Sequence, residues 1–127
     1  MATLLLIDDE TSVRQMLEMT FSTTHECHSA DRAEQALEYL ELQKYDVVIT
    51  DVSMPGLGGL EILKRINEHH SGTPVIVISG RPDQYEEEAI ELGAFAFFGK
   101  PFSLAAMEES VNKAIRESAA ASLHLTN

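Results

Sequence analysis

The sequence predicts a doubly wound α/β sandwich of five β–α units, (βα)5, with helices on both faces of a parallel sheet. Near-continuous apolar runs, which are typical of strands buried on both faces, recur along the chain. Segments with a helical spacing of apolar residues lie between these runs. No internal repeat or low-complexity segment interrupts the alternation, so one α/β domain is expected.

Four apolar runs mark the strong strands, and a weaker run completes the set of five. The strong runs are LLLI (4–7), VVI (47–49), VIVI (75–78) and FAFF (95–98). The weaker run, ECHSA (26–30), is more polar and is expected at an edge of the sheet. Right-handed crossovers place helices on both faces of such a sheet. In folds of this kind, ligands are expected beyond the carboxyl ends of the strands.

The helical segments carry apolar stripes that are expected to face the core. The stripes are Val13, Leu17 and Phe21 with Met16 and Met19 beside them; Ala33, Ala36, Leu37 and Leu40; Leu60, Leu63 and Ile66; and Leu104, Met107, Val111 and Ile115. Two pairs have the spacing of a capping box, Asp31 with Glu34 and Asp83 with Glu86. Gly93 is expected to end the short acidic helix after residue 83, and Ser103 to cap the last helix.

Composition and charge limit the function classes. The 127 residues are the size of one domain, and their net charge of −12 would repel phosphate backbones, so this domain alone is not expected to bind nucleic acid. The longest apolar run is too short for a membrane span, and the first residues lack a basic stretch leading into an apolar signal segment. The single cysteine, Cys27, excludes an internal disulfide. We therefore expect a cytoplasmic protein that favours basic partners and divalent cations.

The crowded acids of LLLIDDE (4–10) could form a solvated turn or hold a cation, because like charges resist ionising together. The residues at the other strand ends favour the cation. Asp8 and Asp9 end the first strand, and Asp51, Ser79 and Lys100 end or follow three further strands. Three aspartate carboxylates, a hydroxyl and an ammonium should therefore meet at one edge of the sheet. Three aspartates and one lysine carry a net charge of −2, which one Mg²⁺ would neutralise. A carboxylate in such a site can accept a phosphoryl group.

The ordered motifs IDDE, ITDVSMPGLGGLE, VIVISG and GAFAFFGKPF resemble the receiver domain of two-component response regulators. The resemblance spans roughly residues 3–118 and implies a flavodoxin-like, five-stranded parallel sheet of order 2-1-3-4-5. It assigns residues 1–120 to the receiver domain and leaves 121–127 as a C-terminal tail or the start of a linker. Both a stand-alone regulator, like those of chemotaxis, and the receiver of a larger protein remain open.

The resemblance implies a role for each residue of the acidic cluster. Asp51 would be the phosphoacceptor, and Asp8 and Asp9 the acid pair that binds Mg²⁺. The backbone carbonyl of Ser53 would complete the protein ligands, together with Asp51 itself. Lys100 would pair with a phosphoryl oxygen.

Further residues would read or tune the phosphorylated state by the same resemblance. Ser79 matches the residue that moves to bond the phosphoryl group, and Phe97 matches the aromatic switch that turns inward on activation. Ser53 and Arg81 occupy positions that tune dephosphorylation. A cis peptide bond is implied before Pro101, where only an X–Pro bond adopts cis at low cost.

The expected function is a phosphorylation-dependent signalling switch, not an enzyme beyond its own phosphotransfer and dephosphorylation. A sensor histidine kinase or histidine phosphotransfer protein is expected to dock on residues 11–23, and a downstream protein or fused output domain on residues 83–118. Two alternatives compete with this interpretation. A Mg²⁺-dependent phosphohydrolase would need a substrate-binding insertion that these short loops lack, and a binding module without phosphotransfer would not need the complete residue set.

Four other motifs favour structural interpretations. GLGG (56–59) lacks the full dinucleotide-binding spacing and is expected to form a turn after Pro55. HECH (25–28) lies on a strand, where alternation separates neighbouring side chains, so a closed zinc site is not expected. His69 and His70 sit near a helix end, where they suit the helix dipole, and the run 86–88 of three glutamates suits a solvated helix face.

Overall fold

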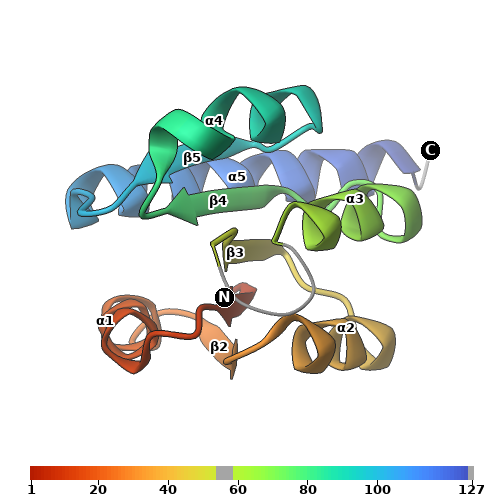
Figure 1. The fold of residues 1–127 in the computed structure, drawn as a ribbon. Helices are drawn as coiled ribbons and strands as arrows, with labels where there is room; N and C mark the ends of the chain where they lie inside the picture. The colour runs from red at the N-terminus through yellow and green to blue at the C-terminus, as the bar shows by residue number, and fades with distance from the viewer. Residues whose placement is uncertain (54–58, 126–127) are drawn as a thin grey trace.

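The computed structural model describes residues 1–53 and 59–125, in which strands and helices alternate along the chain. The elements are β1 (Thr3–Ile7), α1 (Thr11–Phe21), β2 (Glu26–Ala30), α2 (Ala33–Leu42), β3 (Val47–Asp51), α3 (Gly59–His69), β4 (Val75–Ser79), α4 (Pro82–Glu91), β5 (Ala96–Gly99) and α5 (Leu104–Leu125). The strands form one parallel sheet of order β2-β1-β3-β4-β5, as predicted. Helices cover both faces of the sheet (Figure 1).

Two apolar cores lie on opposite faces of the sheet because neighbouring strand residues point to opposite sides. In β1, Leu5 and Ile7 pack in a cluster with residues of α2, α3 and α4. Leu4 and Leu6 pack with residues of α1 and α5 on the other face. All four side chains are fully buried, which explains why this strand is apolar without alternation.

Strand β2 lies at the edge of the sheet, in agreement with the sequence prediction. It pairs only with β1, and its burial rises from an exposed Glu26 to a buried Ala30. The polar composition of residues 26–30 therefore matches a strand with one open side.

Most of the predicted helical stripes face the core, with Met19 as an exception. Leu17 and Phe21 are buried, whereas the Met19 side chain is 78% exposed, so its assignment to the core was wrong. Two positions after Leu17, a helical residue is rotated to the opposite side of the helix. Leu104 is also partly exposed, at the first residue of α5.

Both predicted capping boxes are wrong. Helix α2 begins at Ala33 with Arg32 at the N-cap and no side-chain cap, and the Asp31 carboxylate instead pairs with the Arg32 guanidinium at 3.1 Å. Helix α4 begins one residue before Asp83, at Pro82, because proline is preorganised for the first helical position and needs no N–H partner there. Asp83 therefore lies inside the first turn.

Two other helix ends match the sequence prediction. The Ser103 hydroxyl accepts a hydrogen bond from the Ala106 backbone N–H at 3.2 Å, so Ser103 caps α5. Gly93 ends α4 with a positive φ of 96°. Its N–H donates to the Ile90 carbonyl and the next N–H to the Ala89 carbonyl, both at 3.0 Å, which is the Schellman arrangement.

Replacing Gly93 with alanine is expected to lower the free energy of unfolding by about 2 kcal/mol, because a Cβ is strained at this φ and would lie 2.9 Å from Asn67 Nδ2. Gly72→Ala is the matched control: Gly72 has a similar φ of 98° but open space around the added Cβ. Urea unfolding should show a loss of about 1 kcal/mol for this control. Equal losses in both variants would contradict a contribution from the Asn67 contact.

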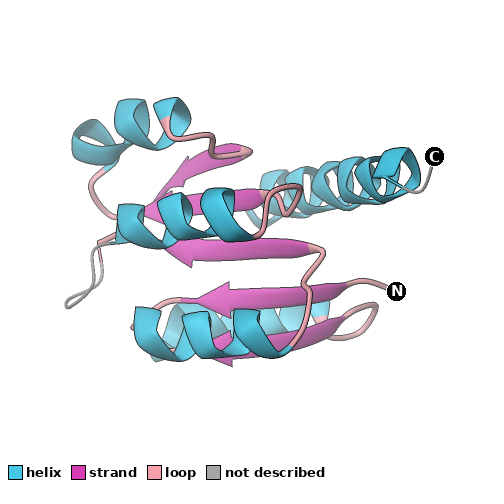
Figure 2. Cartoon of the chain, turned by 90° about the vertical axis from the view of Figure 1, so that its right-hand side faces the viewer, coloured by secondary structure: helices cyan, strands magenta, loops and turns pink. Residues whose placement is uncertain are grey.

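Two sequence expectations concern the C-terminal residues and the segment outside the described ranges. The turn predicted after Pro55 falls in residues 54–58, which are outside them, while Gly59 already belongs to α3. The predicted tail from residue 121 continues α5 as far as Leu125. Figure 2 shows this helix running past the amino-terminal edge of the sheet.

Candidate functional site

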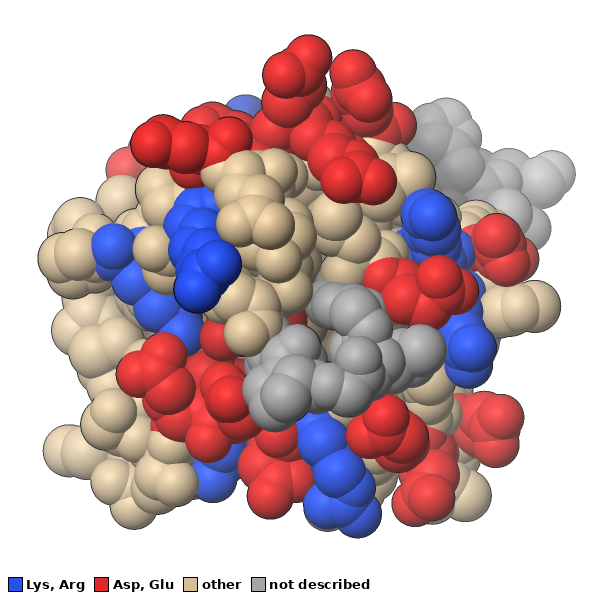
Figure 3. All heavy atoms as spheres, viewed as in Figure 1, with Lys and Arg blue, Asp and Glu red and all other residues tan. Residues whose placement is uncertain are grey.

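The carboxyl ends of the strands bring the predicted site residues to one edge of the sheet. Register sets this arrangement: Ile7 lies beside Thr50, Asp51 beside Ile78, and Ser79 beside Gly99. The residues that follow β1 and β5 therefore converge on the end of β3. Figure 3 views the molecule from this edge, where acidic side chains gather in several groups and basic ones lie between them.

Asp51 is the central carboxylate of this edge and is only 2% exposed. Its Oδ1 accepts hydrogen bonds from the backbone N–H of Ser53 at 2.9 Å and from the Ser53 hydroxyl at 2.8 Å. Its Oδ2 accepts a hydrogen bond from Lys100 Nζ at 3.1 Å. Both oxygens are thus held in place by donors, which fixes the direction of the carboxylate.

Asp8 is a fully buried carboxylate with an incompletely satisfied oxygen. Its Oδ1 accepts the Glu10 backbone N–H at 2.9 Å. Its Oδ2 lies 3.0 Å from Lys100 Nζ but has no hydrogen bond of acceptable geometry. Burial raises the pKa of Asp8 to about 6, and the hydrogen bond from the Glu10 N–H and the nearby Lys100 ammonium offset only part of that effect. A cation placed here would satisfy the oxygen and favour its ionised form.

Lys100 reaches three carboxylates with one ammonium group. Nζ lies 2.7 Å from Glu10 Oε1, 3.0 Å from Asp8 Oδ2 and 3.1 Å from Asp51 Oδ2. Burial disfavours the charge, but the hydrogen bond to Glu10 and the nearby Asp8 and Asp51 carboxylates outweigh it, so the pKa of Lys100 is raised above its usual value. This lysine therefore stays protonated at neutral pH and neutralises part of the acidic cluster.

The backbone around Lys100 fixes where its side chain begins. Its N–H donates to the Ser79 carbonyl at 2.7 Å, and the peptide bond to Pro101 is cis, as the resemblance implied. The preceding Gly99 packs against Pro82, since a Cβ on Gly99 would lie 3.1 Å from Pro82 Cγ. Glycine is needed here for close approach and not for its φ.

The aspartate group can hold a metal ion. Asp8, Asp9 and Asp51 each offer an oxygen within 4.8 Å of the others, and this is the one such group of three or more ligating side chains among those described in residues 1–53 and 60–120. Asp8 and Asp51 are buried, whereas Asp9 is exposed and opens the group to solvent. Carboxylate-only donors and an unsatisfied buried oxygen fit a hard cation such as Mg²⁺.

Among the hydrogen bonds and ion pairs of the described residues, none joins a predicted switch or tuning side chain other than Ser53 and Lys100 to Asp51. Ser79 is fully buried, and its hydroxyl accepts the Arg81 backbone N–H at 2.9 Å. Arg81 itself is exposed, at the N-cap of α4. Phe97 is half-buried on β5 and packs on the core that faces α2, α3 and α4. Ser79 and Phe97 thus lie on the strands that flank α4.

Sequence reasoning missed two charged residues of the site, Glu10 and Arg14. Glu10 is one of the crowded acids but has no role in the sequence prediction, although its carboxylate makes the shortest contact to Lys100. Arg14 Nη1 donates to the Asp8 backbone carbonyl at 2.5 Å and so clamps the β1–α1 connection. The strand-end rule, applied to the third acid of IDDE, could have identified Glu10; nothing in the sequence marks Arg14.

The histidines of HECH have separate partners. His25 Nδ1 accepts the Ala2 backbone N–H at 3.0 Å. The His28 ring lies between the Tyr45 hydroxyl and the Glu26 carboxylate, at 2.7 Å from each. Burial raises the pKa of the Cys27 thiol to about 11, which keeps it protonated and unreactive. These contacts tie β2 to its neighbours.

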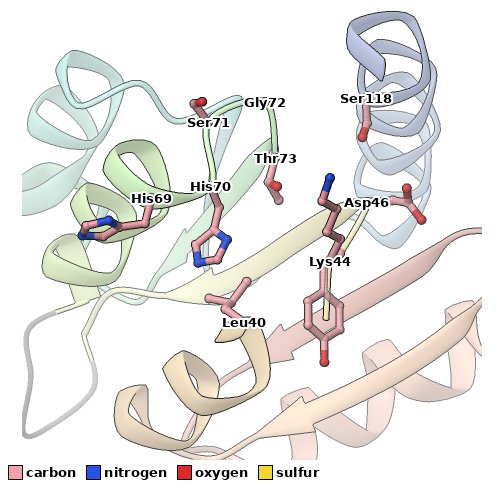
Figure 4. A pocket seen from close by; sticks show the side chains of 10 residues that line it. Leu40, Lys44, Asp46, His69, His70, Ser71, Gly72, Thr73 and Ser118 are labelled. Atoms are coloured by element: carbon pink, nitrogen blue, oxygen red, sulfur yellow. The ribbon is translucent and has the colours of Figure 1, made fainter. Parts of the chain in front are cut away.

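A hollow of about 290 Å³ lies at the opposite edge of the sheet (Figure 4). Lys44 and Asp46 border it before β3, and His70 and Thr73 border it before β4. It is therefore separated from the aspartate group by the length of the strands.

The acidic run 86–88 is exposed along α4, as expected for a solvated helix face.

The parallel sheet of order 2-1-3-4-5, with acids and a lysine at its carboxyl edge, defines the flavodoxin-like receiver class of signalling domains. The family model for the response regulator receiver domain matches residues 4–112. The chain belongs to the response regulator receiver family, and its function is that of a signalling domain of two-component systems. The predicted fold and family are confirmed.

Longer proteins are among the curated relatives that the chain resembles. Regulatory protein AtoC of Escherichia coli (strain K12) is 34% identical over 115 residues, which cover 89% of this chain and 25% of AtoC. Response regulator protein PilR of Pseudomonas aeruginosa is also 34% identical over 115 residues, which cover 88% of this chain and 26% of PilR. The chain spans about a quarter of the length of these curated relatives.

Solved receiver structures have the same fold. A response regulator receiver domain protein from Clostridium thermocellum superposes with a TM-score of 0.86 and 29% identity, covering 94% of this chain and 98% of that one. The response regulator TrrA from Thermotoga maritima, solved in complex with Mg²⁺-BeF, gives a TM-score of 0.81 and 27% identity, covering 90% of this chain and 99% of that one.

In the part of our chain that the structure describes, no helix has the length and apolarity needed to cross a membrane.

Proposed function

We propose that this receiver domain accepts a phosphoryl group on Asp51 from a phosphohistidine and relays the new charge to its surface. One observation carries the proposal: Lys100 Nζ is held between Asp8 and Asp51, at 3.0 and 3.1 Å, while Ser53 fixes the other oxygen of Asp51. A carboxylate so oriented, beside a cation, is arranged for nucleophilic attack on phosphorus.

In the transfer step an Asp51 oxygen forms a bond to phosphorus as the phosphorus–nitrogen bond of the donor breaks. The imidazole leaves with the electron pair of that bond, and the product is an aspartyl phosphate. Lys100 offsets the charge on the phosphoryl oxygens, and Ser53 holds the acceptor in line. Water would later remove the phosphoryl group by hydrolysis, at a rate that Ser53 and Arg81 would tune by the family resemblance.

Mg²⁺ would be held by Asp8, Asp9 and Asp51, with the Ser53 carbonyl as a further ligand carried over from the family. When bound, it supplies positive charge that neutralises the phosphoryl oxygens. The support is the group of carboxylate oxygens and the unsatisfied Asp8 Oδ2. The chain's own residues orient the acceptor and provide the lysine.

The switch would connect Asp51 to α4 and β5. The Ser79 hydroxyl, which accepts from Arg81 in this structure, would turn to donate to a phosphoryl oxygen, and Phe97 would move inward toward the space this opens. Both residues lie next to α4, so the exposed surface formed by residues 83–118 would change. That surface is the proposed contact for a downstream protein or a fused output domain.

The donor would be a sensor histidine kinase or a histidine phosphotransfer protein docked along residues 11–23. We propose a cytoplasmic signalling role, with no enzymatic activity beyond the domain's own phosphotransfer and dephosphorylation. Its net charge of −12 supports protein partners over nucleic acid or an anionic membrane for this domain.

The test is a phosphorylation assay with the purified chain, a small acyl phosphate donor and Mg²⁺, read by intact mass. One phosphoryl group per chain is expected with Mg²⁺ and none with a chelator. A protein that binds Mg²⁺ yet forms neither an adduct nor a stable beryllofluoride complex would contradict phosphotransfer. Continuous release of phosphate from small esters would instead support a phosphohydrolase.

The stabilisation of the protein by Mg²⁺ is expected to disappear as the pH falls through about 6. Because the pKa of Asp8 is raised from 3.8 to about 6, between these pH values Asp8 is protonated in the folded state and ionised in the unfolded chain. The metal-free protein therefore loses stability as the pH rises from about 4 to about 6, while Mg²⁺ needs the ionised carboxylate. Melting temperatures with and without Mg²⁺ across this range check the prediction. Equal Mg²⁺ shifts at about pH 5 and about pH 7.5 would contradict it.

A further inference from the structure

We propose that Glu10 is a positioning residue that holds Lys100 in the resting state and must release it before the lysine can bind an incoming phosphoryl group. The inference rests on the proposed phosphotransfer to Asp51. Its starting point is the ion pair between Glu10 Oε1 and Lys100 Nζ at 2.7 Å, which joins residues 90 positions apart.

The backbone places Glu10 for this contact. Glu10 occupies the N-cap of α1, and its N–H is bound by the buried Asp8 carboxylate at 2.9 Å. Its own side chain does not cap the helix. The carboxylate is instead directed across the edge of the sheet to the lysine that follows β5. An acidic side chain that leaves its helix uncapped is therefore engaged at the candidate phosphoryl site.

Burial decides which of the three carboxylates can release the lysine. The side chains of Asp8 and Asp51 are 0% and 2% exposed, so separating either from Lys100 would leave a buried charge without its counter-ion. The Glu10 side chain is 56% exposed, and water can solvate it once the pair opens. Lys100 would then exchange its contact with Glu10 for a phosphoryl oxygen and keep its buried partners.

The ion pair between Glu10 and Lys100 opposes phosphorylation because it must break before Lys100 can bind the phosphoryl group. Glu10→Gln keeps the shape and an acceptor oxygen but removes the charge. We expect this variant to be phosphorylated about two- to fivefold faster by phosphoramidate with Mg²⁺, followed by intact mass. Glu41→Gln makes the same change in net charge at an exposed position in the last turn of α2, far from the site, and should react at the wild-type rate.

A double-mutant cycle separates an action through Lys100 from simple repulsion of the donor. In a Lys100→Met background, Glu10→Gln should no longer accelerate the reaction. An unchanged or slower Glu10→Gln protein, or an acceleration that persists without the lysine, would overturn the proposal while wild-type phosphorylation stands. Absence of both an adduct and a stable beryllofluoride complex in the Mg²⁺-bound wild type would instead overturn phosphotransfer, and the role of Glu10 with it.

Discussion

Asp51→Asn is expected to abolish the Mg²⁺-dependent phosphate adduct. The amide matches the carboxylate in shape and can still accept both hydrogen bonds from Ser53, but it is not a nucleophile at phosphorus. Lys100 keeps two of its three carboxylate partners in this variant, so the local fold should persist. Intact mass after treatment with an acyl phosphate is the measurement, with circular dichroism to show that the variant is folded.

Asp83→Asn is the matched control for Asp51→Asn, because Asp83 is exposed in the first turn of α4. It should form the same amount of adduct as the wild type. A full adduct on Asp51→Asn would move the acceptor to another carboxylate of the cluster, and peptide mapping of the modified residue would identify which one.

Asp8→Asn is expected to have two effects of opposite sign. The buried amide carries no charge to desolvate, so the metal-free protein should become more stable at neutral pH. A pKa raised from 3.8 to about 6 corresponds to about 3 kcal/mol against the ionised form. This shift is already net of the attraction to Lys100, and we expect the amide to recover about 1–3 kcal/mol of it. Stabilisation by Mg²⁺ should be lost, since a proposed ligand has been removed.

Urea unfolding with and without Mg²⁺ measures both effects in one experiment. Asp31→Asn serves as the control, because the Asp31 carboxylate is exposed and pairs only with Arg32 among the described contacts. It should change neither the metal-free stability nor the Mg²⁺ response appreciably. A less stable metal-free Asp8→Asn protein would show that the lysine contact outweighs the cost of burial.

The fold was predictable because strong local patterns agreed with a simple topological rule. Continuous apolar runs identified the buried strands, and helical spacing identified the helices. The convergence of parallel strand ends was enough to predict that Asp8, Asp51 and Lys100 share one edge of the sheet. These three residues are close to strand termini, so backbone geometry alone brings them together.

The contacts that escaped prediction depend on competition between local alternatives or on side-chain direction. Asp83 has good capping spacing, but Pro82 is better suited to open the helix one residue earlier. The pair of Glu10 with Lys100 requires two long side chains to turn toward each other across the sheet edge. Spacing in the sequence carries no information on that choice of rotamers.

The packing of Gly99 on Pro82 has a mechanical consequence. Lys100 is anchored through its backbone to Ser79 and through its ammonium to Asp51, and the residue before it lies close to the first residue of α4. These contacts connect the acidic cluster to the first turn of α4 through the backbone of residues 99 and 100. A small displacement of the lysine backbone would therefore be transmitted to α4 with little lost to local relaxation.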